Sequence, residues 1–161
     1  MEWVMLNKIK TNPFAMIIWL MLSCVVHIVL FNSKVNSDYQ IWQRILALII
    51  ALCFTFPIHE LLHFVFMKMF CKGSVKIKIM KGPMGLPTFG TVAQAEFKKW
   101  QMVIIYLAPL VLLTLTFDIV FAFCAKVELI FFVISVCNSA GCFYDIVDTL
   151  IVANKKELGN S

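Results

Sequence analysis

Four long apolar stretches separated by short polar segments constrain the fold of this chain more than any other feature. We predict membrane-spanning helices at about residues 14–31, 45–70, 102–125 and 127–152, because each stretch provides roughly the 20 residues that cross a bilayer. Hydrophobic residues make up 61% of the chain, whereas a soluble domain is about 45–50% apolar. The sequence therefore predicts an all-α integral membrane protein whose 161 residues form a single domain.

The basic residues give the predicted four-helix bundle an orientation. Of the 14 lysines and arginines, only Lys34, Arg44 and Lys126 fall on the outer side of the predicted membrane. Because positively charged segments stay in the cytoplasm, we expect both termini and the segment 72–100 to be cytoplasmic. The net charge of +5 then reflects membrane topology and contacts with membrane lipids, and it does not indicate a nucleic-acid partner.

The cytoplasmic segment 72–100 has a pattern of its own. Residues 75–79 alternate apolar and basic side chains, which is the period of a strand with one covered face. The glycines and prolines of 82–87 interrupt the pattern, and 91–95 could form a return strand. We predict a small cytoplasmic β-hairpin between the second and third helices. A basic loop held to anionic lipid headgroups is the alternative.

The second apolar stretch contains the string His59-Glu60-Leu61-Leu62-His63. On a helix, histidines at i and i+4 lie one turn apart on the same face and can bind one Zn²⁺. The glutamate between them can act as general base on a metal-bound water. Ionisable groups inside a membrane helix carry a high desolvation cost, so three within one turn indicate a functional metal site.

A catalytic zinc usually takes three protein ligands, and membrane depth selects the third. His63 lies about 18 residues, or roughly 27 Å, from the outer end of its span, in the cytoplasmic half. His27 and Asp118 belong to the outer halves of their spans and are too far away. Asp145 matches the depth of His63, and Asp148 lies one turn deeper. We therefore predict Asp145 as the third ligand and keep Asp148 as the alternative.

Two further residues lie close to this predicted site. Asn138 is seven residues before Asp145, so the two share a helix face. Asn138 could hydrogen-bond the substrate or the developing oxyanion, or it could be an interhelical packing contact. Pro57 removes one backbone hydrogen bond two residues before His59, and the resulting kink could open space for metal and water.

The chain also resembles a known family. The motif at 59–63, the pair Ala108-Pro109 and the stretch from Asn138 to Ile146 are similar to motifs of the putative zincin peptidases, which are small bacterial membrane proteins. A more distant similarity is to site-2-type intramembrane metalloproteases. The resemblance implies zinc ligation by His59, His63 and Asp145, with Glu60 as the catalytic base, in a bacterial plasma membrane. It also implies that the 72–100 hairpin pairs with an extended substrate.

Together these observations lead us to expect a zinc-dependent membrane-embedded peptidase that acts on a peptide or membrane-protein substrate in or near the cytoplasmic leaflet. Glu60 and Asn138 are the expected catalytic residues, and Zn²⁺ is the expected cofactor. One alternative is a non-catalytic metal-binding membrane protein that acts as an immunity, regulatory or interaction partner. A metal transporter or sensor is the other, although the spans offer few further polar residues for a permeation path.

Overall fold

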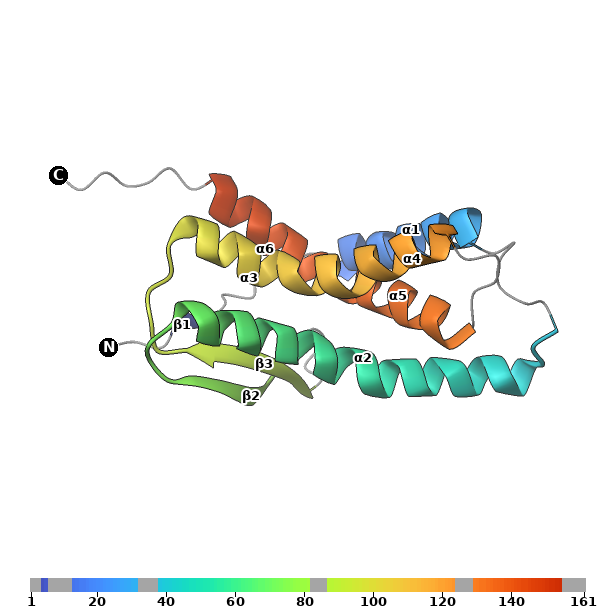
Figure 1. Cartoon of the computed structure of the whole chain (residues 1–161), viewed down its shortest axis with the longest axis horizontal. Helices are drawn as coiled ribbons and strands as arrows, with labels where there is room; N and C mark the ends of the chain where they lie inside the picture. The colour runs from blue at the N-terminus through green and yellow to red at the C-terminus, as the bar shows by residue number, and fades with distance from the viewer. Residues whose placement is uncertain (1–3, 6–12, 32–37, 82–86, 124–128, 155–161) are drawn as a thin grey trace.

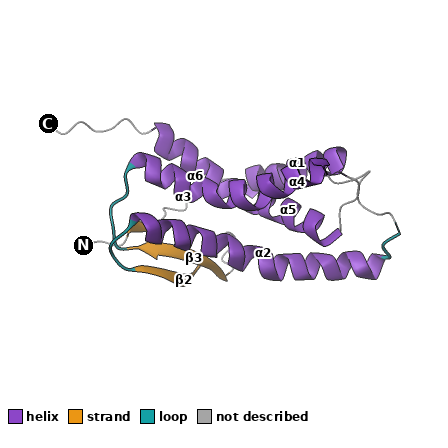
Figure 2. Cartoon of the chain, viewed as in Figure 1, coloured by secondary structure: helices purple, strands orange, loops and turns teal. Residues whose placement is uncertain are grey.

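A computed structural model describes residues 4–5, 13–31, 38–81, 87–123 and 129–154 of the chain. The elements in order are β1 Val4–Met5, α1 Pro13–Phe31, α2 Ile41–Phe70, β2 Val75–Lys81, β3 Pro87–Ala93, α3 Lys99–Pro109, the π-helical segment η3 Leu110–Leu115, α4 Thr116–Phe123, α5 Leu129–Gly141 and α6 Phe143–Asn154. Helices dominate, as Figure 2 shows, and the sheet is small. The predicted class, helical with a hairpin between the second and third long helices, is confirmed.

Helix α2 organises the bundle, because it runs along most of the molecule's long axis and packs against both α3 and α5 (Figure 1). Its buried face is one stripe at a spacing of four residues. This spacing exceeds the 3.6 residues of one helical turn, so the stripe winds slowly around the helix. The members of the stripe are Ala47, Ala51, Thr55, His59, His63 and Met67. Both histidines of the 59–63 motif therefore face the interior of the bundle.

The number of membrane spans differs from the prediction. Among the described residues, α2 and the continuous helix Lys99–Phe123 are long and apolar enough to cross a membrane. Helices α5 and α6 form a third span only if the pair counts as one, because they are bent by 41° at their junction. The apolar stretch Phe14–Leu30 within α1 is shorter than these spans. The structure thus supports two or three spans where the sequence predicted four.

The predicted fourth span is broken at Cys142 for an identifiable reason. Helix α5 ends at Gly141. Two residues earlier, the Trp19 indole of α1 donates to the Ser139 carbonyl at 2.9 Å. In an unbroken helix that carbonyl would accept from the backbone N–H of Phe143, so a side chain from another helix competes for it. The bend at this point gives α6 a direction of its own, beginning just before Asp145.

The hairpin is antiparallel, with Val75 opposite Ala93 and Lys81 opposite Pro87. Its return strand therefore begins and ends earlier than the predicted 91–95. The sheet also has a third strand that the sequence did not indicate, because β1 pairs with β3 at Ala93 and Val92. The resulting strand order is β1-β3-β2, with β3 in the centre.

A small apolar core fixes the sheet to the helices. Met67 of α2, Ala93 of β3 and Ile105 of α3 are buried against one another. Partly buried side chains surround them: Phe66, Phe70, Val75 and Phe97. Because one residue from each of the three elements contributes to this core, the position of β3 relative to the motif helix is determined by packing. The sheet lies beside the C-terminal half of α2, as Figure 1 shows.

The tight connection between α2 and β2 requires glycine at position 73. A Cβ atom at Gly73 would lie 2.5 Å from the Gln94 carbonyl oxygen, which is backbone and cannot rotate away. We predict that Gly73→Ala destabilises the protein by about 1–3 kcal/mol, the usual cost of overpacking. Gly141→Ala is the matched control, because its Cβ would meet Phe56 Cε1 at an ordinary 3.8 Å. Thermal unfolding in detergent should show a lower Tm for Gly73→Ala alone, and equal Tm values for the two variants would contradict this packing.

Candidate metal centre

The two histidines of α2 bring their outer ring nitrogens together. His59 Nε2 and His63 Nε2 are 3.2 Å apart, and the rings meet edge to face with centroids 4.9 Å apart. Only 8% of His59 and 2% of His63 is exposed. The spacing of four residues on the buried stripe of α2 accounts for this arrangement. It matches the geometry predicted from the sequence motif.

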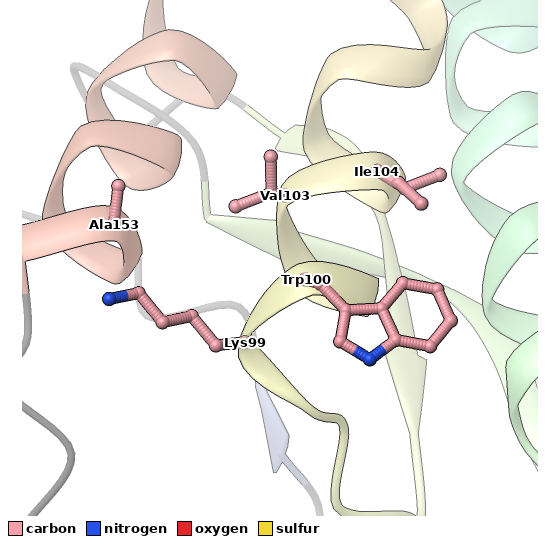
Figure 3. A pocket seen from close by; sticks show the side chains of 5 residues that line it. All are labelled: Lys99, Trp100, Val103, Ile104 and Ala153. Carbon is pink, nitrogen blue, oxygen red and sulfur yellow. The ribbon is translucent and has the colours of Figure 1, made fainter.

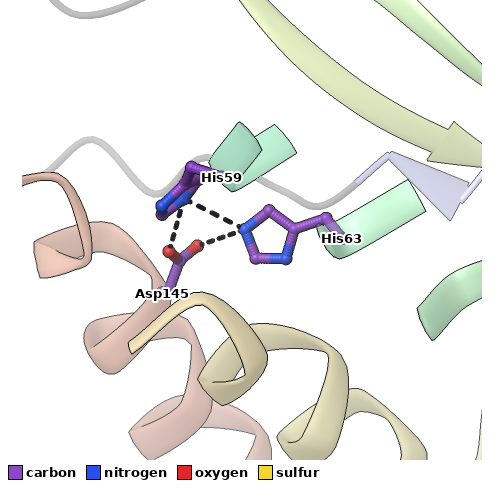
Figure 4. Close-up of side chains that lie close together, drawn as sticks. All are labelled: His59, His63 and Asp145. Atoms are coloured by element: carbon purple, nitrogen blue, oxygen red, sulfur yellow. Dashed lines mark hydrogen bonds and ion pairs between the residues drawn. The ribbon is translucent and has the colours of Figure 1, made fainter. Parts of the chain in front are cut away.

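Asp145 completes the cluster from the first turn of α6. Its Oδ2 atom lies 3.0 Å from His59 Nε2, and its Oδ1 atom lies 3.3 Å from His63 Nε2 (Figure 4). Within the described part of the chain, His59, His63 and Asp145 form the group that could hold a metal ion. Asp148 is also buried but does not belong to this group. The structure therefore brings together the two histidines and Asp145, the aspartate that we selected by its depth in the membrane.

The far side of each imidazole is held by a hydrogen-bond acceptor, which determines where its proton lies. The Nδ1–H of His63 donates to the Ile105 carbonyl at 2.9 Å. His59 Nδ1 faces Asn138 Oδ1 at 3.0 Å. The Asn138 amide nitrogen donates to the Pro109 carbonyl and to Thr114 Oγ1, so the amide oxygen must be the atom facing His59. These acceptors favour a proton on Nδ1 of each ring, and a neutral imidazole with its proton there presents the Nε2 lone pair to the cluster.

The cluster is thus three electron-rich groups with their lone pairs pointing at one another. Asp145 Oδ2 is buried, and its polar contact among the described residues is with the lone-pair side of His59 Nε2, so no assigned donor satisfies it. One added proton would satisfy a single contact, whereas one divalent cation would satisfy all three. Four ligands at the Zn–N and Zn–O distances of proteins form a tetrahedron with edges of about 3.3 Å. The two imidazole nitrogens are 3.2 Å apart, and each lies 3.0 or 3.3 Å from one of the two Asp145 oxygens, so the donor set fits zinc.

Asn138 contacts His59 on the side of the ring that faces away from Asp145. It is 1% exposed, and its amide contacts His59, Pro109 and Thr114. Pro109 and Thr114 belong to the end of α3 and to the π-helical segment, whose wider turn places a backbone carbonyl and a hydroxyl within reach of α5. Of the two roles considered for Asn138, its contacts favour an interhelical one, with the amide also orienting His59.

Glu60 lies to one side of the ligand stripe and is partly buried. Its nearest polar partner is Thr91 of β3, whose hydroxyl lies 3.3 Å from Glu60 Oε2 and 3.2 Å from the Glu60 carbonyl oxygen. Sequence reasoning missed Thr91, because no periodic pattern links a residue of the hairpin to one turn of α2. The carboxylate is adjacent to the metal ligands and faces the sheet.

His27 and Asp118 form a separate polar cluster, as expected of residues too far from the motif. His27 Nδ1 donates to the Ser23 carbonyl at 2.8 Å, and His27 Nε2 lies 3.4 Å from Asp118 Oδ1. The Ser135 hydroxyl donates to the same carboxylate oxygen at 2.7 Å. This cluster links α1, α4 and α5, and neither residue belongs to the metal-ligand group.

Two other features near the bundle supply no ligand. Cys142 Sγ lies 4.0 Å from His59 Nδ1, the nitrogen on the far side of the ring from the cluster. A shallow hollow of about 480 Å³ lies between the start of α3 and the end of α6 (Figure 3). It is lined by Lys99, Trp100, Val103, Ile104 and Ala153. None of the three ligand residues takes part in its lining.

Comparison with known proteins agrees with this geometry. The model of a protein family described as "putative zincin peptidase" matches residues 52–157, which is well over half of the chain. The matched region includes both histidines of the motif, Glu60, Asn138 and Asp145. No curated protein and no solved structure matches the chain. The match confirms the resemblance seen in the sequence, and the chain belongs to the putative zincin peptidase family.

Proposed function

We propose that this protein is a zinc-dependent, membrane-embedded peptidase, with His59, His63 and Asp145 as the metal ligands. The convergence of two imidazoles and one carboxylate, all buried inside an apolar bundle, is the observation that carries the proposal. Imidazole and carboxylate ligands suit zinc, with iron and cobalt as chemically possible occupants. The family match supports peptide hydrolysis as the reaction.

Each residue of the site has a separate role in the proposed reaction. His59 and His63 hold the ion through Nε2, while Asn138 and the Ile105 carbonyl keep the rings in the required tautomer. Bound zinc supplies Lewis acidity toward the scissile carbonyl and lowers the pKa of a coordinated water. Glu60 accepts a proton from the attacking water and delivers it to the leaving amine. Burial of the three ligands keeps bulk water away from the reacting groups.

The substrate of this proposal is a peptide segment in extended form. A helical membrane segment must unwind first, because its own backbone hydrogen bonds cover the scissile carbonyl. The hairpin lies beside α2, and β2 is at the edge of the described sheet. An edge strand can pair with an added strand, which would hold the substrate backbone straight near Glu60. The lysine distribution supports an orientation with both termini and the hairpin in the cytoplasm, and this part of the proposal requires α1 to cross the membrane as well.

Metal analysis of purified variants tests the ligand set. We expect one zinc per chain in the wild type and its loss in His63→Ala and in Asp145→Ala, since each removes one of three ligand groups. Asp148→Ala is the matched control, because it removes a buried carboxylate of the same helix that lies outside the cluster. Elemental analysis after dialysis against trace zinc gives the stoichiometry. Retention of zinc in Asp145→Ala together with its loss in Asp148→Ala would assign the third ligand to Asp148.

Glu60→Gln separates catalysis from metal binding. The amide keeps the size of the side chain but cannot take a proton, so we expect full zinc content and a loss of kcat of about 100-fold or more. The assay reconstitutes the zinc-loaded protein in liposomes with a synthetic apolar peptide whose centre is interrupted by Gly-Pro, and it follows the fragments by mass spectrometry. Unchanged turnover in Glu60→Gln would remove the general-base role. A wild type that never cleaves the peptide would count against the peptidase proposal and favour a non-catalytic metal protein.

A further inference from the structure

Thr91 is placed where the sheet meets the metal-binding helix. It lies in β3, the central strand, and it is 1% exposed. Its hydroxyl lies 3.2 Å from the Glu60 carbonyl oxygen and 3.3 Å from Glu60 Oε2. Within the described residues, this is the polar contact between the hairpin and the carboxylate that follows the first histidine of the motif. The contact joins two segments 31 residues apart in the sequence.

The hydroxyl has one proton and two acceptors in reach. Both distances exceed the 2.7–2.8 Å of a typical single O–H···O bond, as expected when one proton is shared. The Glu60 carbonyl already has a partner available in the helix ladder, the backbone N–H of Phe64. The carboxylate has no such helical partner, and a charged acceptor forms the stronger bond. The Thr91 hydroxyl therefore forms its stronger hydrogen bond when it donates to Glu60 Oε2.

Packing fixes the position of the Thr91 hydroxyl along the strand. Ala93, two residues further on the same face of β3, is fully buried against Met67 and Ile105. Across the hairpin, Thr91 pairs with Ile77 of β2. A register shift of one residue would turn Thr91 to the opposite face of the sheet. The register of the hairpin thus decides whether the hydroxyl meets Glu60.

We propose that Thr91 is a positioning residue that holds one oxygen of the Glu60 carboxylate and so aims the other oxygen at the attacking water. The catalytic part of this inference rests on the proposed peptidase function. The hairpin then has a second role besides binding substrate. Strand β3, which carries Thr91, also sets the orientation of the Glu60 carboxylate. Loss of the hydroxyl then lowers kcat without changing metal affinity or substrate affinity.

Three threonine variants test the proposal in the liposome assay with the Gly-Pro peptide. Thr91→Val keeps the shape of the side chain and removes the hydroxyl, so we expect kcat to fall about tenfold, equivalent to roughly 1.4 kcal/mol. KM and zinc content should stay within twofold of the wild type. Thr91→Ser restores the hydroxyl and should recover most of kcat. Thr116→Val is the control, because the exposed Thr116 hydroxyl donates to the Val111 carbonyl of its own continuous helix at 3.1 Å.

Three results would overturn the positioning role. A wild-type kcat in Thr91→Val would show that the hydroxyl is not needed. Equal defects in Thr91→Ser and Thr91→Val would assign the effect to packing, since serine retains the donor and loses only the methyl group. Loss of zinc in Thr91→Val would show that Thr91 supports the metal centre as a whole, with no specific action through Glu60.

A second measurement does not depend on peptide hydrolysis. Thermal unfolding is compared for Thr91→Val in the wild-type background and in a Glu60→Ala background, where the carboxylate is missing. We expect Thr91→Val to lower the Tm more in the wild-type background, whereas Thr116→Val should act equally in both. Equal Tm losses for Thr91→Val would show that the two side chains are not coupled. If the wild type cleaves no peptide but this coupling is present, the contact stands and the peptidase function fails.

Discussion

Two imidazole nitrogens and the two oxygens of one carboxylate meet at separations of 3.0, 3.2 and 3.3 Å inside an apolar bundle, and this electrostatic constraint explains much of the surrounding structure. The far side of each ring faces an acceptor, the Asn138 amide oxygen for His59 and the Ile105 carbonyl for His63, so a neutral ring with its proton there has none to donate within the cluster. One bound cation would interact favourably with both imidazole nitrogens and with the carboxylate. This is why the cluster is best understood as a metal centre.

Two departures from regular helix geometry position the residues of the metal centre. A straight α3 would not have the π-helical turn after Pro109, and the acceptors that hold the Asn138 amide come from this region. The predicted fourth span bends by 41° near Cys142, and Asp145 lies in the first turn after that bend. Both irregularities lie at the level of the ligands. Departures from regular helix inside a membrane are stable where buried groups satisfy the freed backbone, and side chains from neighbouring helices do so here.

Local periodicity made part of this site predictable from sequence. The spacing of His59 and His63 needs only the geometry of one helix, and the depth argument for Asp145 needs only a position along the membrane normal, which a bend in the helix changes little. The hairpin followed from alternation over 75–79. The remaining features depend on contacts between distant segments. Trp19 meets Ser139, Asn138 meets Pro109, and Thr91 meets Glu60. Within the described residues, β1 pairs through Val4 and Met5, a segment too short to show a strand period.

The most direct test of the metal centre is X-ray absorption at the zinc edge of the purified, zinc-loaded wild-type protein. We expect a first shell of two imidazole nitrogens and oxygen ligands at about 2.0–2.2 Å, without sulfur. We also expect the outer-shell scattering characteristic of two histidine rings. A shell that contains sulfur, for which Cys142 is the nearest candidate, or that contains a single imidazole, would contradict the assignment of His59, His63 and Asp145 as the ligands.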